Sequence, residues 1–127
     1  METDTTVATA AASEPDLQTA LYEFNVAVIE IYKDLLCESE RVASRHLFRA
    51  ACIFSEAVAG VLRAEVEEWR TAGALEARRR IQECLYWLWL LDERGYLAGN
   101  ESRDQAFTQA FYLHEALTGL VSDHGTG

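Results

Sequence analysis

Proline occurs once in this chain of 127 residues, at position 15. Because proline interrupts helices and is common in the turns of β proteins, the long stretch after Pro15 favours long helices and argues against a turn-rich β fold. Half of the residues are hydrophobic and a quarter are charged, which is the composition of an ordinary globular protein. The length suits a single domain with one core.

Hydrophobic residues recur every three or four positions in four segments, which is the spacing of one face of a helix. We expect helices at about 17–37, 42–62, 64–94 and 103–122, the second of them beginning at Val42 or Ser44. The stripe of the first helix consists of Leu17, Leu21, Phe24, Val28, Ile31 and Leu35. In the third helix, Thr71–Gly73 is a candidate kink. Gly95 follows that helix where a left-handed glycine often ends one.

Four helices with short connections predict an all-α fold, specifically an antiparallel up-and-down four-helix bundle. We expect the bundle to span residues 17–122, between a disordered acidic N-terminal tail at 1–16 and a disordered C-terminal tail at 123–127. The N-terminal segment lacks the positive charge and the apolar run of a secretory signal, and no apolar run approaches the ~20 residues that cross a membrane. We therefore expect a cytoplasmic protein without a membrane segment.

The first and third helices carry more hydrophobic residues than one small bundle can bury. The residues beyond the two core stripes include Tyr22, Val26 and Ile29 in the first helix and Tyr86, Trp87 and Trp89 in the third. A large exposed apolar patch usually marks an interface. We therefore predict a homo-oligomer with these six residues in its interface. The alternative is a monomer whose aromatic side chains are half-buried on its surface.

Arginine provides ten of the eleven basic residues, and eight arginines lie between positions 41 and 80. This window is net positive, although the whole chain has a net charge of −10. The two clusters are Arg41, Arg45 and Arg49 on one face of the second helix, and Arg78, Arg79 and Arg80 in the third. Because guanidinium groups bind phosphate, these six are the candidate nucleic-acid-binding residues. The alternative is a helix face paired with Glu76 and Glu83.

The sequence contains no motif that indicates catalysis or a cofactor. The Glu-x-x-His pair of di-iron bundles, the Walker loop and the glycine-rich dinucleotide motif do not occur. His114 lies on an apolar stripe, as a hydrogen-bonded packing histidine would. Cys37, Cys52 and Cys84 form no CxxC pair, and we expect reduced, buried thiols. We therefore expect no enzyme activity, no metal and no cofactor.

The segment Arg49–Gly60, RAACIFSEAVAG, resembles the second-helix signature R-A-A-x-S-I-P-x-N-I-A-E-G of a family of small four-helix-bundle proteins. The family comprises proteins encoded in intervening sequences of large ribosomal RNA genes and the accessory variability determinant proteins of diversity-generating retroelements. The matching positions, without a gap, are Arg49, Ala50, Ala51 and Ala59, and farther on Ala77, Glu83, Gly95, Tyr96 and Leu97.

This resemblance implies a homopentamer whose retroelement members assist a reverse transcriptase and bind its template RNA. We therefore expect a non-enzymatic, homo-oligomeric accessory protein with a reverse transcriptase and structured RNA as partners. The alternative follows from the net charge of −10: an acidic protein–protein interaction module or scaffold that binds no nucleic acid.

Overall fold

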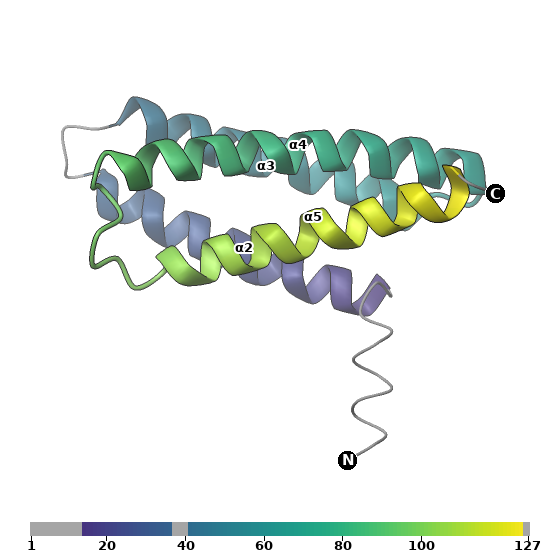
Figure 1. The fold of residues 1–127 in the computed structure, drawn as a ribbon, viewed down its shortest axis with the longest axis horizontal. Coiled ribbons are helices and arrows are strands. Elements are labelled where there is room, and N and C mark those ends of the chain that lie inside the picture. The colour runs from purple at the N-terminus through teal and green to yellow at the C-terminus, as the bar shows by residue number, and fades with distance from the viewer. Residues whose placement is uncertain (1–13, 37–40, 126–127) are drawn as a thin grey trace, which may run out of the picture.

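The computed structural model describes residues 14–36 and 41–125, which form an antiparallel bundle of helices (Figure 1). The helices are α2 (Glu14–Leu35), α3 (Val42–Arg63), α4 (Glu67–Glu93) and α5 (Arg103–Gly125). Each helix packs on the next, and α5 packs on α2, whereas the backbones of the diagonal pairs α2–α4 and α3–α5 do not approach each other closely. The predicted up-and-down four-helix bundle is confirmed. We call the end that holds residues 94–102, at the left of Figure 1, the loop end.

The buried faces of the helices follow the predicted spacing. In α2 every member of the predicted stripe is buried except Leu21, which is half-buried. Phe24 of α2 and Phe54 of α3 are fully buried and meet edge to face, with ring centroids 6.0 Å apart. Burying side chains of this size contributes roughly 1.5–3 kcal/mol each, so this shared core holds the four helices together. None of the described helices is long and apolar enough to cross a membrane.

Two helices extend beyond their predicted ends. α2 begins at Glu14, because Pro15 is tolerated in a first turn, where its missing N–H would have no partner in any helix. α5 continues to Gly125 instead of ending at Ser122, since no helix-breaking residue intervenes. Residues 14–16 and 123–125 therefore belong to helices and not to the expected tails. Residues 1–13 and 126–127 lie outside the described part of the chain.

The structure decides between the two predicted starts of α3 and differs from the prediction for α4 in two details. α3 begins at Val42 and not at Ser44, which is buried in the first turn, where its hydroxyl donates to the Arg41 carbonyl at 3.1 Å. α4 begins at Glu67 and is continuous through Gly73, so the candidate kink is absent. A Cβ at Gly73 would stand 3.1 Å from a methyl carbon of Val61. The glycine therefore serves the close approach of α4 to α3.

The end of α4 is fixed by Gly95, as predicted. Gly95 has a φ of +85°, and its N–H donates to the Asp92 carbonyl at 3.0 Å. The N–H of Tyr96 donates to the Leu91 carbonyl at 3.0 Å. This is the Schellman arrangement, which satisfies the last carbonyls of a helix and folds the following residue back over its final turn. It brings Tyr96 to the hollow described below.

The first turn of α5 is bound to the last turn of α4 by Arg103. Its guanidinium donates to both carboxylate oxygens of Asp92, at 2.7 and 2.9 Å, and lies 5.2 Å from the ring centroid of Phe107. The paired guanidinium lowers the pKa of the Asp92 carboxyl. This bidentate pair fixes where the loop between the two helices leaves and rejoins the bundle.

Candidate functional site

Three arginines lie along the outer face of α3 next to the loop end. Arg41, Arg45 and Arg49, which we call the arginine row, are all exposed. No carboxylate of the described residues pairs with their guanidinium groups. Because they are one helical turn apart, the row extends for about 12 Å along α3. The arginine row is therefore an accessible strip of positive charge.

The second predicted cluster has a different environment. Glu76 accepts hydrogen bonds from Arg79 at 2.9 Å and from Arg80 at 2.7 Å, and these bonds lower the pKa of the Glu76 carboxyl. A guanidinium nitrogen of Arg80 also lies 3.5 Å from a carboxylate oxygen of Glu83. Arg78 is half-buried and lines a shallow surface hollow together with Leu75. Carboxylates thus offset the charge of two of the three arginines, as the alternative interpretation of this run expected.

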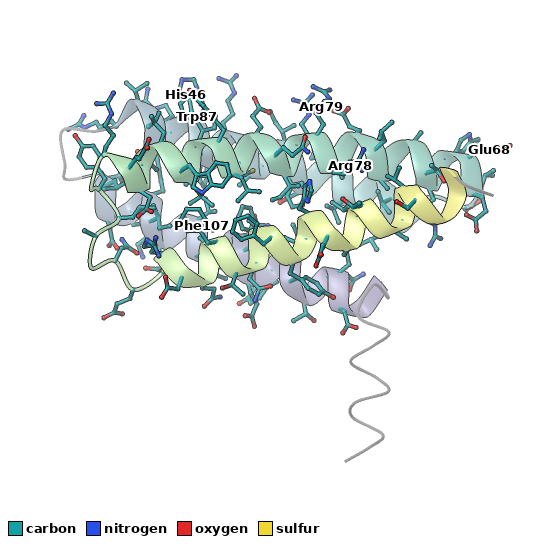
Figure 2. All side chains as sticks on the ribbon, in the orientation of Figure 1. His46, Glu68, Arg78, Arg79, Trp87 and Phe107 are labelled. Atoms are coloured by element: carbon teal, nitrogen blue, oxygen red, sulfur yellow. The ribbon has the colours of Figure 1, made fainter. Side chains whose placement is uncertain are left out.

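The two arginine clusters lie on different helices, and no carboxylate among the described residues bridges them. The arginine row lies beside the last turns of α4, because His46, which follows Arg45, contacts Trp87. Arg80 precedes Trp87 by seven residues, which corresponds to about 10 Å along the helix. Figure 2 shows the same separation, with Arg78 and Arg79 well away from His46 and Trp87.

Aromatic rings lie beside the arginine row. The imidazole of exposed His46 stacks on Trp87, with centroids 4.6 Å apart and the planes inclined by 10° (Figure 2). Tyr86 meets Trp87 edge-on at 4.9 Å. Trp87 is therefore half-buried, whereas Tyr86 and Trp89 are each 56% exposed. Of the four aromatic residues predicted for the oligomer interface, Trp87 is the one that is partly covered within its own chain.

A surface hollow of about 270 Å³ opens between the start of α3 and the end of α4. We call it the α3–α4 hollow. Its apolar lining includes Val42, Leu90 and the rings of Trp87 and Tyr96. Among the described residues, Arg94 is the charged member of this lining, and no carboxylate belongs to it. The hollow therefore combines two flat rings with positive charge, and Arg41 immediately precedes Val42 on its α3 side.

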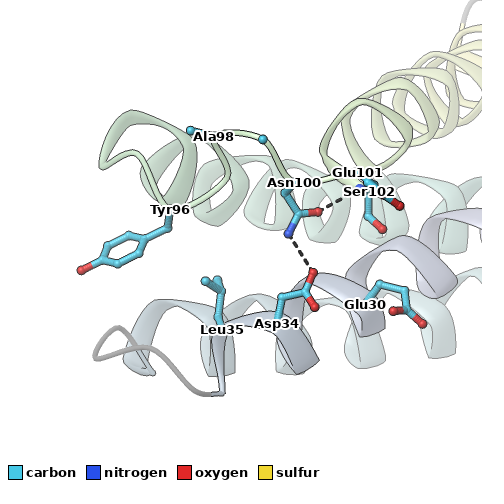
Figure 3. A pocket seen from close by; sticks show the side chains of 9 residues that line it. Glu30, Asp34, Leu35, Tyr96, Ala98, Asn100, Glu101 and Ser102 are labelled. Atoms are coloured by element: carbon cyan, nitrogen blue, oxygen red, sulfur yellow. Dashed lines mark hydrogen bonds between the residues drawn. The ribbon is translucent and has the colours of Figure 1, made fainter.

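A second hollow at the loop end has the opposite charge (Figure 3). It lies between α2 and the loop, and its lining includes Glu30, Asp34 and Glu101. The side-chain amide of Asn100 donates to Asp34 at 3.0 Å. Tyr96 lines both hollows. A phosphate would be repelled by the carboxylates of this second hollow and attracted to the arginines of the first.

Two groups of exposed apolar side chains include the residues predicted for the oligomer interface. On α2, Tyr22, Val26 and Ile29 are 69%, 36% and 43% exposed, and we call them the α2 stripe. On a different face of the bundle an aromatic band consists of Tyr86, Trp89 and Phe111. The ring centroids of Trp89 in α4 and Phe111 in α5 lie 6.5 Å apart, and the ring of Phe107 stacks on that of Phe111. α4, which carries Tyr86 and Trp89, is diagonal to α2, so the two surfaces lie on different faces of the bundle.

The cysteines and His114 were also assigned roles from the sequence. Cys84 is buried as expected, and burial raises the pKa of its thiol. The prediction was wrong for Cys52, which is exposed because it lies at the outer edge of the α2–α3 seam. Cys37 lies outside the described residues. His114 has the expected hydrogen-bond partner, since its ring nitrogen lies 3.2 Å from the Gln82 amide.

Sequence reasoning did not assign His46, Arg94 and Tyr96 to the site. One signal pointed to Tyr96: it follows the glycine that ends an aromatic-rich helix, and in a Schellman end such a residue folds back on the helix. Nothing in the spacing of His46 identified Trp87 as its partner, because that contact depends on how α3 and α4 align.

Comparison of the chain with known protein families, with curated proteins and with solved structures finds no match. The family resemblance of Arg49–Gly60 therefore stays a prediction. Within residues 14–36 and 41–125, no group of three His, Cys, Asp or Glu side chains is arranged to hold a metal ion.

Proposed function

We propose that this protein is a non-enzymatic, homo-oligomeric accessory protein of the cytoplasm that binds RNA and a reverse transcriptase. The observation that carries the proposal is the pair of apolar surfaces on different faces of the bundle, the α2 stripe and the aromatic band. Tyr22 at 69% exposure and Trp89 at 56% are costly to leave in water. Contact with further copies of the chain would bury both surfaces.

Two different apolar surfaces on separate faces favour a head-to-tail assembly. If the aromatic band of one copy docks on the α2 stripe of the next, each copy still offers one free surface of each kind. Such contacts close into a ring when the rotation between neighbours permits it. The pentamer implied by the family resemblance is one such ring. Trp87 is omitted from this interface, because His46 stacks on one face of its ring.

The RNA-binding part of the proposal is supported by the arginine row. The net charge of −10 gives no general attraction for RNA, so binding has to be local. Arg41, Arg45 and Arg49 are exposed and have no carboxylate partner in the described chain. In a ring every copy contributes the same row, so a long RNA could contact several rows at once and gain avidity.

A second candidate function is an acidic interaction module without nucleic-acid binding, and the net charge of −10 favours it. Such a module would bind a basic protein surface, and the binding would weaken as salt is added. It predicts that neither wild type nor any arginine variant binds RNA at low salt.

The two candidates are separated by RNA binding, measured as the anisotropy of a fluorescent structured RNA at low salt. The test variant replaces Arg41, Arg45 and Arg49 by Gln. Arg63→Gln is the matched control, because Arg63 is exposed on the same helix at its other end. We expect the triple variant to lose about tenfold or more in affinity and the control to keep it.

Equal binding by wild type and the triple variant, or no binding by either, would contradict the RNA-binding part. A further variant, Arg78→Gln/Arg79→Gln/Arg80→Gln, compares the second cluster. We expect a smaller loss there, because Glu76 and Glu83 already offset Arg79 and Arg80. For the second partner, a reverse transcriptase gene with a variable repeat beside the gene for this protein would support the assignment.

A further inference from the structure

The α3–α4 hollow has the size and lining of a site for one flat ring. Its volume of about 270 Å³ lies below that of typical pockets for drug-sized ligands. Trp87 and Tyr96 contribute aromatic rings, and Leu90 adds an apolar surface. Tyr96 is held there by the Schellman end of α4, in which its N–H bonds to the Leu91 carbonyl. The backbone from which the stacking side chain projects is therefore fixed by the fold before any ligand arrives.

The charges around the hollow indicate what would be attached to such a ring. Arg94 belongs to the lining, and Arg41 precedes Val42 of the lining in sequence. Arg45 and Arg49 continue the positive strip along α3. Guanidinium groups bind phosphate with paired hydrogen bonds. A flat ring joined to a chain of phosphates is a nucleotide of a nucleic-acid strand.

We propose that the α3–α4 hollow binds one unpaired base of single-stranded RNA while the arginine row contacts the phosphates that follow it. This inference rests on the proposed RNA-binding function and specifies the form of RNA. A base inside a duplex is stacked and paired, so it offers its edge but not its faces. Stacking of unpaired bases on aromatic side chains, combined with a basic track for the backbone, is how single strands are bound without duplex recognition.

The test compares a short unstructured RNA with the duplex it forms with its complement, at the same low salt and with full-length protein. Tyr96→Leu keeps an apolar side chain but removes the flat ring. Trp69→Leu is the matched control, because Trp69 is an exposed aromatic residue in the first turn of α4, at the end opposite the hollow. We expect wild type to prefer the single strand, and Tyr96→Leu to lose about tenfold in affinity for it. The duplex affinity of Tyr96→Leu and both affinities of Trp69→Leu should stay as in wild type.

A second readout avoids any effect of Tyr96→Leu on folding. The chain has three tryptophans, and in Trp69→Phe/Trp89→Phe only Trp87 remains. Single-stranded RNA should quench the fluorescence of Trp87, because a stacked base would contact its ring. Equal affinity for single strand and duplex, together with unquenched Trp87, would overturn the base-binding site and leave RNA binding intact. Absence of binding to either RNA would overturn the proposed function as well.

Discussion

The imidazole of His46 in α3 lies flat on the indole of Trp87 in α4, with ring centroids 4.6 Å apart and the planes inclined by 10°. Stacked aromatic pairs contribute about 0.5–1.5 kcal/mol beyond the area they bury. This contact aligns the first turns of α3, which carry the arginine row, with the last turns of α4, which line the hollow. It therefore links the two parts of the candidate RNA site.

Replacing His46 by Ala should uncover one face of Trp87. We expect a loss of about 1 kcal/mol in the free energy of unfolding, measured with denaturant, and a red shift of the tryptophan emission. His114→Ala is the control, because the imidazole of His114 pairs with the Gln82 amide and does not stack on a tryptophan ring. If the two variants have the same emission spectrum as wild type, the His46–Trp87 stack does not exist in solution.

Replacing Gly95 or Gly60 by alanine should change the stability of the protein in opposite directions. Gly95 has a φ of +85°, which costs an L side chain about 1–2 kcal/mol, so Gly95→Ala should destabilise the protein by about that amount. Gly60 lies inside α3 with no atom within 4 Å of an added Cβ. Gly60→Ala should therefore stabilise it by about 0.5–1 kcal/mol. Thermal unfolding of both variants measures the difference, and effects of the same sign would contradict the structure at one of the two positions.

The Arg103–Asp92 pair predicts a dependence of stability on acid. Arg103 holds the pKa of Asp92 below its ordinary value of 3.8, so the pair stabilises the fold above that pH. The contribution is lost as the pH falls through the lowered pKa. Asp92→Asn should cost about 1 kcal/mol at about pH 7. The difference in the free energy of unfolding between Asp92→Asn and wild type should shrink in strong acid. Urea unfolding at about pH 7 and in strong acid measures this difference. A difference independent of pH would show that the carboxylate charge contributes nothing.

The two described cysteines should differ in reactivity. Cys84 is fully buried with a raised thiol pKa, whereas Cys52 is exposed. In a Cys37→Ser background, an alkylating reagent should modify Cys52 first and reach Cys84 only after unfolding. Mass spectrometry of the native protein over time follows both sites. Modification of both thiols at one rate would mean that the core around Cys84 opens readily.

The sequence predicted the helices and their buried faces, because the spacing of residues such as Phe24 and Ile31 depends only on helix geometry. The same reasoning anticipated that Tyr22 and Trp89 exceed what one bundle buries. It also anticipated the Glu76–Arg80 pair, whose partners lie one turn apart on one helix. The His46–Trp87 stack was out of reach, because it depends on how two helices align along their lengths.

The hollow and the exposure of Cys52 also depend on how the helices align, whereas the end of α4 does not. The role of Gly95 follows from local chain chemistry and could be predicted. The arrangement of Tyr96 beside Arg94 and Val42 depends on how close the end of α4 comes to the start of α3. Cys52 was assigned to the core because free cysteines are usually buried, but its position at the outer edge of the α2–α3 seam leaves it exposed.

The central claim is that the α2 stripe and the aromatic band bring copies of the chain together. The most direct test is the mass of the purified protein in solution, measured by light scattering after gel filtration. We expect a multiple of the subunit mass of 14.3 kDa, five times that value for the proposed ring, and a shift toward the single subunit in Tyr22→Ser/Trp89→Ser. A wild-type protein that stays at 14.3 kDa at high concentration would contradict the account.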